Sequence, residues 1–333
     1  MLILFLSSVL AENAIDLSLT KYGQVDTSNP AVELTFNETI DEFTVQLKCG
    51  SKRFSKTATM ISQGQKFNIE LPIAKGKAKC SGTLEAVFDK DNIGNMPLNF
   101  SIEMLPPLNI NIDRSSVNMK EKHLKVKIDR PAAQYKVELL NVNQNLLTAG
   151  NINVPKSQNL SAQEISWGDT SDEVAIIRVH AKDVHGFSSY IDLLPWHYDI
   201  PHEDVIFESN QAEVRSSEEP KLVAVKKEID AVFKKYEKIA KANLYVAGYT
   251  DTVGSAQSNL SLSKKRAKAI AIWFRNQKFG GKIYYQGFGE GALAVPTADG
   301  VDQAENRRAL YIVAAEKPPR SKDLPRGSWT LLK

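Results

Sequence analysis

The spacing of apolar residues changes near residue 200, and this change constrains the fold more than any other feature of the chain. Before it, apolar and polar residues alternate, as at 67–71, 124–128 and 135–139. A period of two is typical of strands that bury one face. After it, apolar residues recur at intervals of three and four, which is typical of amphipathic helices. We therefore expect an all-β N-terminal part and an α/β C-terminal part.

Residues 16–200 are expected to form two all-β domains. The adjacent prolines at 106 and 107 divide this part into residues 16–105 and residues 106–200, and each half has the size and strand spacing of an immunoglobulin-like sandwich. The alternative is a transmembrane β-barrel. Its strands need apolar bands of about 9–11 residues and aromatic girdles. The alternating runs of this chain are shorter and its aromatic residues are scattered, which favours the sandwiches.

Residues 201–316 are expected to form an α/β domain. Ser216 and Glu219 have the spacing of a capping box at the start of a helix. The expected elements follow in the order β-α-β-α-β-β, at 205–207, 222–236, 244–247, 260–277, 283–286 and 309–313. Short connections in this order indicate helices packed on one side of a mixed sheet. Residues 317–333 are rich in proline and basic residues and lack periodicity, so we expect a flexible, solvated tail.

The N-terminus resembles an export signal. Residues 1–11 contain an apolar run that is too short to span a bilayer but has the length of a secretory signal peptide. No Lys or Arg precedes the run, so a buried first strand stays as the alternative. We expect an exported protein that resides in the periplasm and associates with the outer membrane or cell wall.

Cys49 and Cys80 are the two cysteines, and both are in phase with the alternating apolar pattern. In an exported protein they could form a disulfide across a sandwich core. Two buried free thiols are the alternative.

Residues 248–254, with the sequence GYTDTVG, place a charged side chain where a strand ends. Asp251 lies at the C-terminal edge of the expected strand, and Arg266 lies about two turns into the next helix. Because the loop folds the helix back beside its strand, both groups can reach one crevice outside the strand ends, where ligands bind in open α/β sheets. An ordinary ion pair between Asp251 and Arg266 is the alternative interpretation.

The motif continues with SAQSNLSLSKKRA at 255–267, GFGE at 287–290 and ENRR at 305–308. Residues 204–315 thereby resemble the OmpA-like peptidoglycan-binding family. The resemblance implies that this domain binds the diaminopimelate of the peptidoglycan stem peptide. Asp251 would hold the ammonium of that group, and the planar guanidinium of Arg266 would hold its carboxylate. It implies a protein that is not an enzyme and needs no cofactor.

Other residues of the motif are expected to support the site: Thr250, Thr252, Gly254, Asn259, Leu262, Asn306, Arg307 and Arg308. Backbone N–H groups near Thr252 could add donors, and Asn259 could fix the loop to the helix. Asn306 is expected to tie a loop to the last strand, and the two arginines could reach glycan or peptide carboxylates. The sequence departs from the family at Tyr249, where the family has His, and at 302–303, where Asp-Gln replaces Gly-Arg. We expect the first departure to change the wall of the crevice.

Composition and motifs exclude several other classes of protein. The 42 cationic and 39 anionic side chains nearly balance, so no nucleic-acid partner is expected. The five histidines lack metal-ligand spacing, and no nucleophile or P-loop motif is present, so we expect neither a metal nor catalysis. Two alternatives remain: an integral outer-membrane β-barrel protein that carries the same domain, and a subunit of an envelope-spanning complex. If the chain is instead a non-catalytic protein that binds the cell wall, its two β domains could bind another envelope protein or act as spacers.

Overall fold

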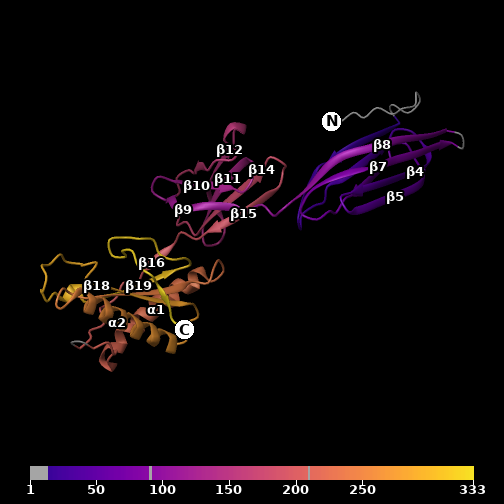
Figure 1. Ribbon diagram of the computed structural model, residues 1–333. Helices are drawn as coiled ribbons and strands as arrows, with labels where there is room; N and C mark the ends of the chain where they lie inside the picture. The colour runs from indigo at the N-terminus through magenta and orange to yellow at the C-terminus, as the bar shows by residue number, and fades with distance from the viewer. Residues whose placement is uncertain (1–13, 90–91, 209–210) are drawn as a thin grey trace.

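The computed structural model describes residues 14–89, 92–208 and 211–333. Over these residues the chain forms two β-rich units and then a unit that contains helices, in chain order (Figure 1). The signal peptide predicted for residues 1–11 lies outside the described residues. Within the described residues, no helix has the length and apolar character needed to cross a membrane.

The N-terminal unit consists of two sheets around one core. Its strands are β1 (Ile15–Thr20), β2 (Tyr22–Gln24), β3 (Ala31–Phe36), β4 (Ile40–Cys49), β5 (Lys52–Ile61), β6 (Lys66–Glu70), β7 (Gly76–Asp89) and β8 (Asn92–Leu105). One sheet has the order β1-β3-β6 and the other β2-β8-β7-β4-β5. Phe36 of the first sheet meets Phe43 of the second, with ring centroids 5.0 Å apart. The period of two thus gives each sheet one apolar face, and the two faces pack together.

Cys49 and Cys80 form a disulfide with an S–S distance of 2.01 Å. The two residues are paired on the neighbouring strands β4 and β7 of one sheet. The expectation of a bridge across the core was therefore wrong in its placement, because both side chains enter the core from the same sheet. The bridge joins positions 31 residues apart, and such a link restricts the unfolded chain.

The middle unit also packs two sheets around one core. It contains β9 (Ile110–Asn118), β10 (His123–Ile128), β11 (Ala132–Leu140), β12 (Leu146–Asn153), the 3₁₀ turn η1 (Lys156–Gln158), β13 (Gln163–Ser166), β14 (Ile176–Asp183) and β15 (Ser188–Leu193). The sheet orders are β13-β10-β9 and β12-β11-β14-β15. Pro106 lies between this unit and the first, and its carbonyl accepts a hydrogen bond of 2.6 Å from Arg130. The proline pair therefore marks the joint between the two units.

The C-terminal unit is a mixed sheet with both helices on one face. It contains β16 (His197–Asp199), η2 (Ser216–Glu218), α1 (Glu219–Tyr236), β17 (Asn243–Tyr249), α2 (Ala256–Asn276), β18 (Ile283–Gly289), η3 (Ala304–Asn306), β19 (Ala309–Ala314) and β20 (Thr330–Leu331). The strand order is β16-β19-β17-β18-β20, with β17 and β18 parallel and the other neighbours antiparallel. Apolar side chains of α1 and α2 share a core with Leu244 and Val246 of β17. The ends of the parallel strands β17 and β18 thus lie at one edge of the sheet.

Two local predictions for this unit were wrong. Residues 205–207 form no strand, and the edge of the sheet is taken by β16, which pairs with β19. Val205 and Phe207 still pack against the helix-side core, so their apolar character reflects packing without strand pairing. The predicted capping box is also not formed. The helix α1 begins at Glu219, and the residue before it, Glu218, makes no side-chain cap. The Glu218 carboxylate instead accepts a hydrogen bond of 3.0 Å from the backbone N–H of Ile206.

The tail at 317–333 covers the sheet face opposite the helices. Alternate residues of β17, among them Tyr245 and Tyr249, point to this face. Leu324 is buried there, and the Trp329 ring packs edge-on against Tyr245 at 5.1 Å. β20 then pairs with β18 and extends the sheet. The expectation of a flexible, solvated tail was therefore wrong, because both faces of β17 are apolar and each needs a cover.

The middle and C-terminal units share apolar packing at their joint. Ala175 and Ile176 of the middle unit belong to the same core as Trp196 and Tyr236. The Trp196 and Tyr236 rings stack at 3.9 Å, and the Tyr236 hydroxyl donates a hydrogen bond to Glu173. Burial and the Glu173 carboxylate raise the pKa of Tyr236. The domain boundary predicted at residue 200 therefore lies where the two units pack against each other through apolar side chains.

Candidate ligand-binding site

The loop after β17 is buried although it is polar. Thr250, Asp251 and Thr252 are each at most 7% exposed, and Ser255 caps α2 by accepting a hydrogen bond from Ser258. Gly254 has a φ of +99°, a conformation that favours glycine. The strand–loop–helix unit predicted from the GYTDTVG motif is therefore present, with a buried carboxylate at its turn.

Several of the predicted supporting residues hold this loop in place. Asn259 donates 3.3 Å to the Asp251 carbonyl and 2.6 Å to the Glu290 carboxylate. The Thr252 hydroxyl donates 2.7 Å to the Ala298 carbonyl. Thr250 donates its backbone N–H 3.0 Å to Gly289, at the end of β18. These contacts attach the loop to α2, to the loop after β18 and to the sheet.

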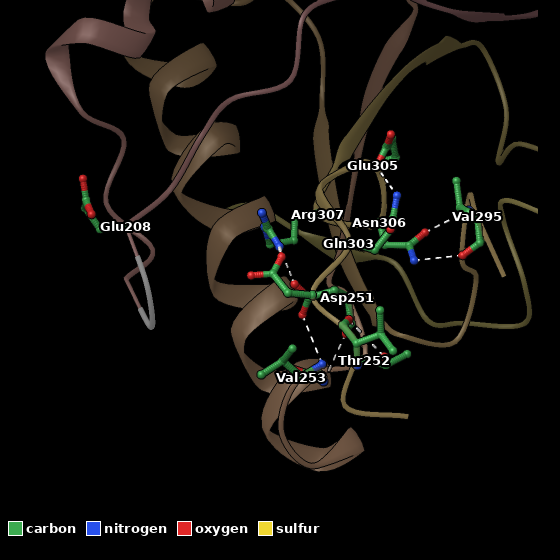
Figure 2. Close-up of polar contacts among 12 residues, drawn as sticks. Glu208, Asp251, Thr252, Val253, Val295, Gln303, Glu305, Asn306 and Arg307 are labelled. Atoms are coloured by element: carbon green, nitrogen blue, oxygen red, sulfur yellow. Dashed lines mark hydrogen bonds and ion pairs between the residues drawn. The ribbon is translucent and has the colours of Figure 1, made fainter. Parts of the chain in front are cut away.

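Two further predicted residues, Asn306 and Leu262, have a structural role. Asn306 makes two hydrogen bonds with the backbone of Val295, at 2.9 and 3.0 Å, and so ties the loop after β18 to the start of β19 (Figure 2). Leu262 is partly buried on α2. Neither side chain carries a charge that could bind an ionic ligand.

The Asp251 carboxylate is held by Arg307. One carboxylate oxygen accepts from the Val253 N–H at 3.2 Å, and the other accepts from Arg307 Nη1 at 2.6 Å. Figure 2 shows the Arg307 guanidinium directed at this carboxylate. Arg307 also pairs with Asp302, and the two carboxylates raise the pKa of the guanidinium. The ion pair between Asp251 and Arg266, weighed from the sequence, is thus replaced by one with Arg307.

Arg266 is a buried cation whose hydrogen-bond partners are neutral. Its guanidinium donates 3.0 Å to the Gln211 carbonyl and 3.3 Å to the Glu208 carbonyl, and it lies over the Phe207 ring at 5.0 Å. In the described parts of the chain it forms no ion pair with a carboxylate. Burial lowers the pKa of Arg266, the charge of Arg307 lowers it further, and Asp251 acts in the opposite direction. Arg266, Arg307 and Asp251 therefore interact electrostatically with one another.

The cavity that Arg266 and Arg307 line is small. A cavity of about 10 Å³ is lined by Phe207, Arg266, Arg307 and neighbouring residues of the sheet and α2. A volume of this size accommodates about one water molecule. A ligand group that enters this cavity must therefore displace side chains that line it.

Arg308 and Tyr249 face the tail. Arg308 donates 2.7 Å to the Asp323 carboxylate and lies over the Tyr249 ring at 4.7 Å. The Tyr249 hydroxyl donates to the Asp323 carbonyl, and its ring stacks on Phe288 at 5.5 Å. The Tyr249 side chain therefore packs on the sheet face that the tail covers, as the alternation along β17 requires, and residue 249 also lines the small cavity beside Arg266.

His202 joins the segment before α1 to the strand that carries the arginines. Its Nδ1 lies 2.7 Å from the Ile200 carbonyl and its Nε2 2.6 Å from the Ala309 carbonyl. A carbonyl oxygen only accepts, so both contacts are hydrogen bonds only when both ring nitrogens carry protons. Burial lowers the pKa of His202, but the hydrogen bonds to Asp204 and to the two carbonyls outweigh it, and the net shift is upward.

We expect the stability of this domain to fall as the pH rises from below the ordinary pKa of histidine, about 6.5, to above the raised pKa of His202. Because the folded-state pKa is raised, the contribution is fully present below the unfolded-state pKa and is lost as the pH rises through the folded-state value. The loss should be about 1 kcal/mol, the net value of one hydrogen bond. Urea unfolding at a pH below and a pH above this range measures it. The His202→Gln protein should lack this fall, and an equal fall in both proteins would contradict the assignment.

The fold and the site together define an α/β domain with an ionic site at the carboxyl ends of its strands. Residues 206–307 match the OmpA family, and this part of the chain is an OmpA-family domain. A search of curated proteins finds no match.

Several solved structures of low sequence identity are similar to parts of this chain. The peptidoglycan-associated lipoprotein from Burkholderia pseudomallei is 22% identical, with a TM-score of 0.27 over 33% of this chain and 88% of that one. The cell wall anchor of the T6SS from Pseudomonas aeruginosa is 22% identical, with a TM-score of 0.26 over 44% and 86%. A two-domain fibronectin type-III segment from chicken tenascin is 13% identical, with a TM-score of 0.22 over 54% and 97%.

Sequence reasoning missed some of the residues at the site. Glu208 and Gln211 contact Arg266 through backbone carbonyls, which carry no signal in the sequence. Asp302 was noted only as a departure from the family, although its carboxylate pairs with Arg307. Phe207 was assigned to a strand, and its apolar side chain instead packs on the guanidinium.

Proposed function

We propose that the C-terminal domain binds peptidoglycan of the diaminopimelate type, and that the protein does so without catalysis. Membership of residues 206–307 in the OmpA family supports a binding domain of the cell envelope. The observation that carries the proposal is the buried guanidinium of Arg266, whose hydrogen-bond partners among the described residues are all neutral and whose charge interacts with that of Asp251. A buried charge without a counter-ion is costly, and a ligand carboxylate would supply that counter-ion.

The chemistry of the ligand follows from the two charges. The end of diaminopimelate carries an ammonium and a carboxylate on one carbon, so it can pair with Asp251 and Arg266 together. Each contact is a charge-assisted hydrogen bond, which contributes about 1.5–3 kcal/mol when well formed. A stem peptide with lysine lacks the carboxylate and would leave Arg266 without a counter-ion. The domain should therefore distinguish the two types of peptidoglycan.

We further propose that the protein is exported and that its two β-rich units are immunoglobulin-like sandwiches. These units would act as spacers or present a surface to another envelope protein, while the C-terminal domain attaches the chain to the cell wall. A single site with two ionic contacts binds its ligand with moderate affinity, so firm attachment to the cell wall would require many copies or a second contact.

Co-sedimentation with purified sacculi of the diaminopimelate type tests the proposal. The full-length protein should sediment with the sacculi, and Asp251→Ala and Arg266→Ala should each remove the protein from the pellet. Lys265→Ala, which removes an exposed cation from the same helix, is the matched control and should sediment normally. Retention of both site variants in the pellet would rule the proposal out.

A further inference from the structure

Arg307 lies between two carboxylates that differ greatly in exposure. Its Nη1 contacts both Asp251 and Asp302. The Asp251 side chain is 10% exposed, whereas that of Asp302 is 77% exposed. An ion pair in solvent is weakened by water and salt, and a partly buried one much less so. The guanidinium therefore has a strong partner inside the site and a weaker one at its rim.

The contact with Arg307 occupies the place that a ligand ammonium needs. One oxygen of Asp251 accepts from the Val253 N–H, and Arg307 holds the other at 2.6 Å. An ammonium that approaches this oxygen must compete with the guanidinium for the same lone pairs. Arg307 also acts on Arg266 as a like charge, and it lowers the pKa of Arg266. The interior position of Arg307 thus opposes the binding of a cation at Asp251.

We propose that Arg307 is a built-in competitor for the ligand ammonium, and that Asp302 is the positioning residue that receives Arg307 when the ligand binds. This inference rests on the function proposed above. Because Nη1 already contacts both carboxylates, the transfer requires a rotation of the Arg307 side chain and no change of fold. The backbone just before Arg307 stays fixed, since Asn306 bonds to Val295 on both sides of its amide.

The charges remain balanced during this exchange. Asp251, Asp302, Arg266 and Arg307 sum to zero in the free protein. A zwitterionic ligand adds an ammonium at Asp251 and a carboxylate at Arg266, while Arg307 remains paired with Asp302. Asp302 therefore sets the affinity through Arg307 and does not touch the ligand.

A double-mutant cycle tests the exchange. The probe is the synthetic stem tripeptide that ends in meso-diaminopimelate, titrated calorimetrically into the full-length protein. Asp302→Asn should weaken binding by about five-fold, because Arg307 then has only Asp251 to pair with. Asp302→Glu, which keeps the carboxylate charge that Asp302→Asn removes, should show the wild-type affinity. Asp299→Asn, an equal charge change at an exposed site in the same loop, is the matched control and should leave the affinity unchanged.

The decisive comparison uses Arg307→Gln as the background. In this background no guanidinium competes for Asp251 and none pairs with Asp302, so adding Asp302→Asn should cause no further loss of affinity for the tripeptide. An equal loss in both backgrounds would show that Asp302 attracts the ligand directly and would overturn the inference. A wild-type affinity for Asp302→Asn in the native background would also overturn it. Absence of tripeptide binding by the wild-type protein itself would instead remove the proposed function on which the inference rests.

Discussion

Deletion of residues 319–333 is expected to destabilise the C-terminal domain by about 5 kcal/mol, the order of the losses measured when one or two large core side chains are removed. The deletion removes Leu324 and Trp329 from the apolar face that carries Tyr245, Tyr249 and Phe288. It also removes β20 from the edge of the sheet. A loss of this size approaches the whole stability of an ordinary domain, so much of the truncated domain should be unfolded. Hydrogen exchange along β17 and β18, compared with the full-length protein, measures the effect.

A charge-removing control separates the loss of apolar contacts from the loss of positive charge in the tail. Arg320 and Lys322 are exposed cations in the same segment, and replacing both with alanine should leave the exchange of β17 and β18 unchanged. Protection that survives the deletion would contradict the assigned role of the tail. Fragments for binding experiments should therefore extend from before β16 to residue 333.

The second large effect concerns selectivity at Arg266. Arg266→Gln should abolish the preference for a stem tripeptide ending in diaminopimelate over one ending in lysine. In the wild-type protein the lysine peptide leaves a buried guanidinium without its carboxylate, a penalty of about 1.5–3 kcal/mol or roughly 10- to 150-fold in affinity. The variant has no guanidinium to pair with a carboxylate, so its affinities for the two peptides should become equal. Lys265→Gln is the control and should keep the preference; a preserved preference in Arg266→Gln would refute the role of Arg266 in selectivity.

The strand–loop–helix unit of the site could be predicted because its signals are local. The strand that ends at Tyr249, the turn at Gly254 and the helix that carries Arg266 each follow from periodicity and turn chemistry. The ionic partners could not be predicted in the same way. Arg307 reaches Asp251 from 56 residues further along the chain, through a loop without periodic residues. The partners of Arg266 are backbone carbonyls, which every residue possesses.

The errors in the fold have a similar cause. The tail lacks any period, yet Trp329 and Leu324 find an apolar face that only the assembled sheet presents. The edge strand comes from 197–199 and not from 205–207, because strand pairing depends on which segment can reach β19. The two β-rich units were easier to predict, since alternating residues bury one face of each strand wherever that strand lies in the sheet.

The central claim is that the C-terminal domain recognises a zwitterion through Asp251 and Arg266. The most direct measurement is the ratio of the dissociation constants of the full-length protein for the two stem tripeptides, one ending in diaminopimelate and one in lysine. We predict that the diaminopimelate peptide binds at least about ten-fold more tightly. Equal affinities, or tighter binding of the lysine peptide, would contradict the claim.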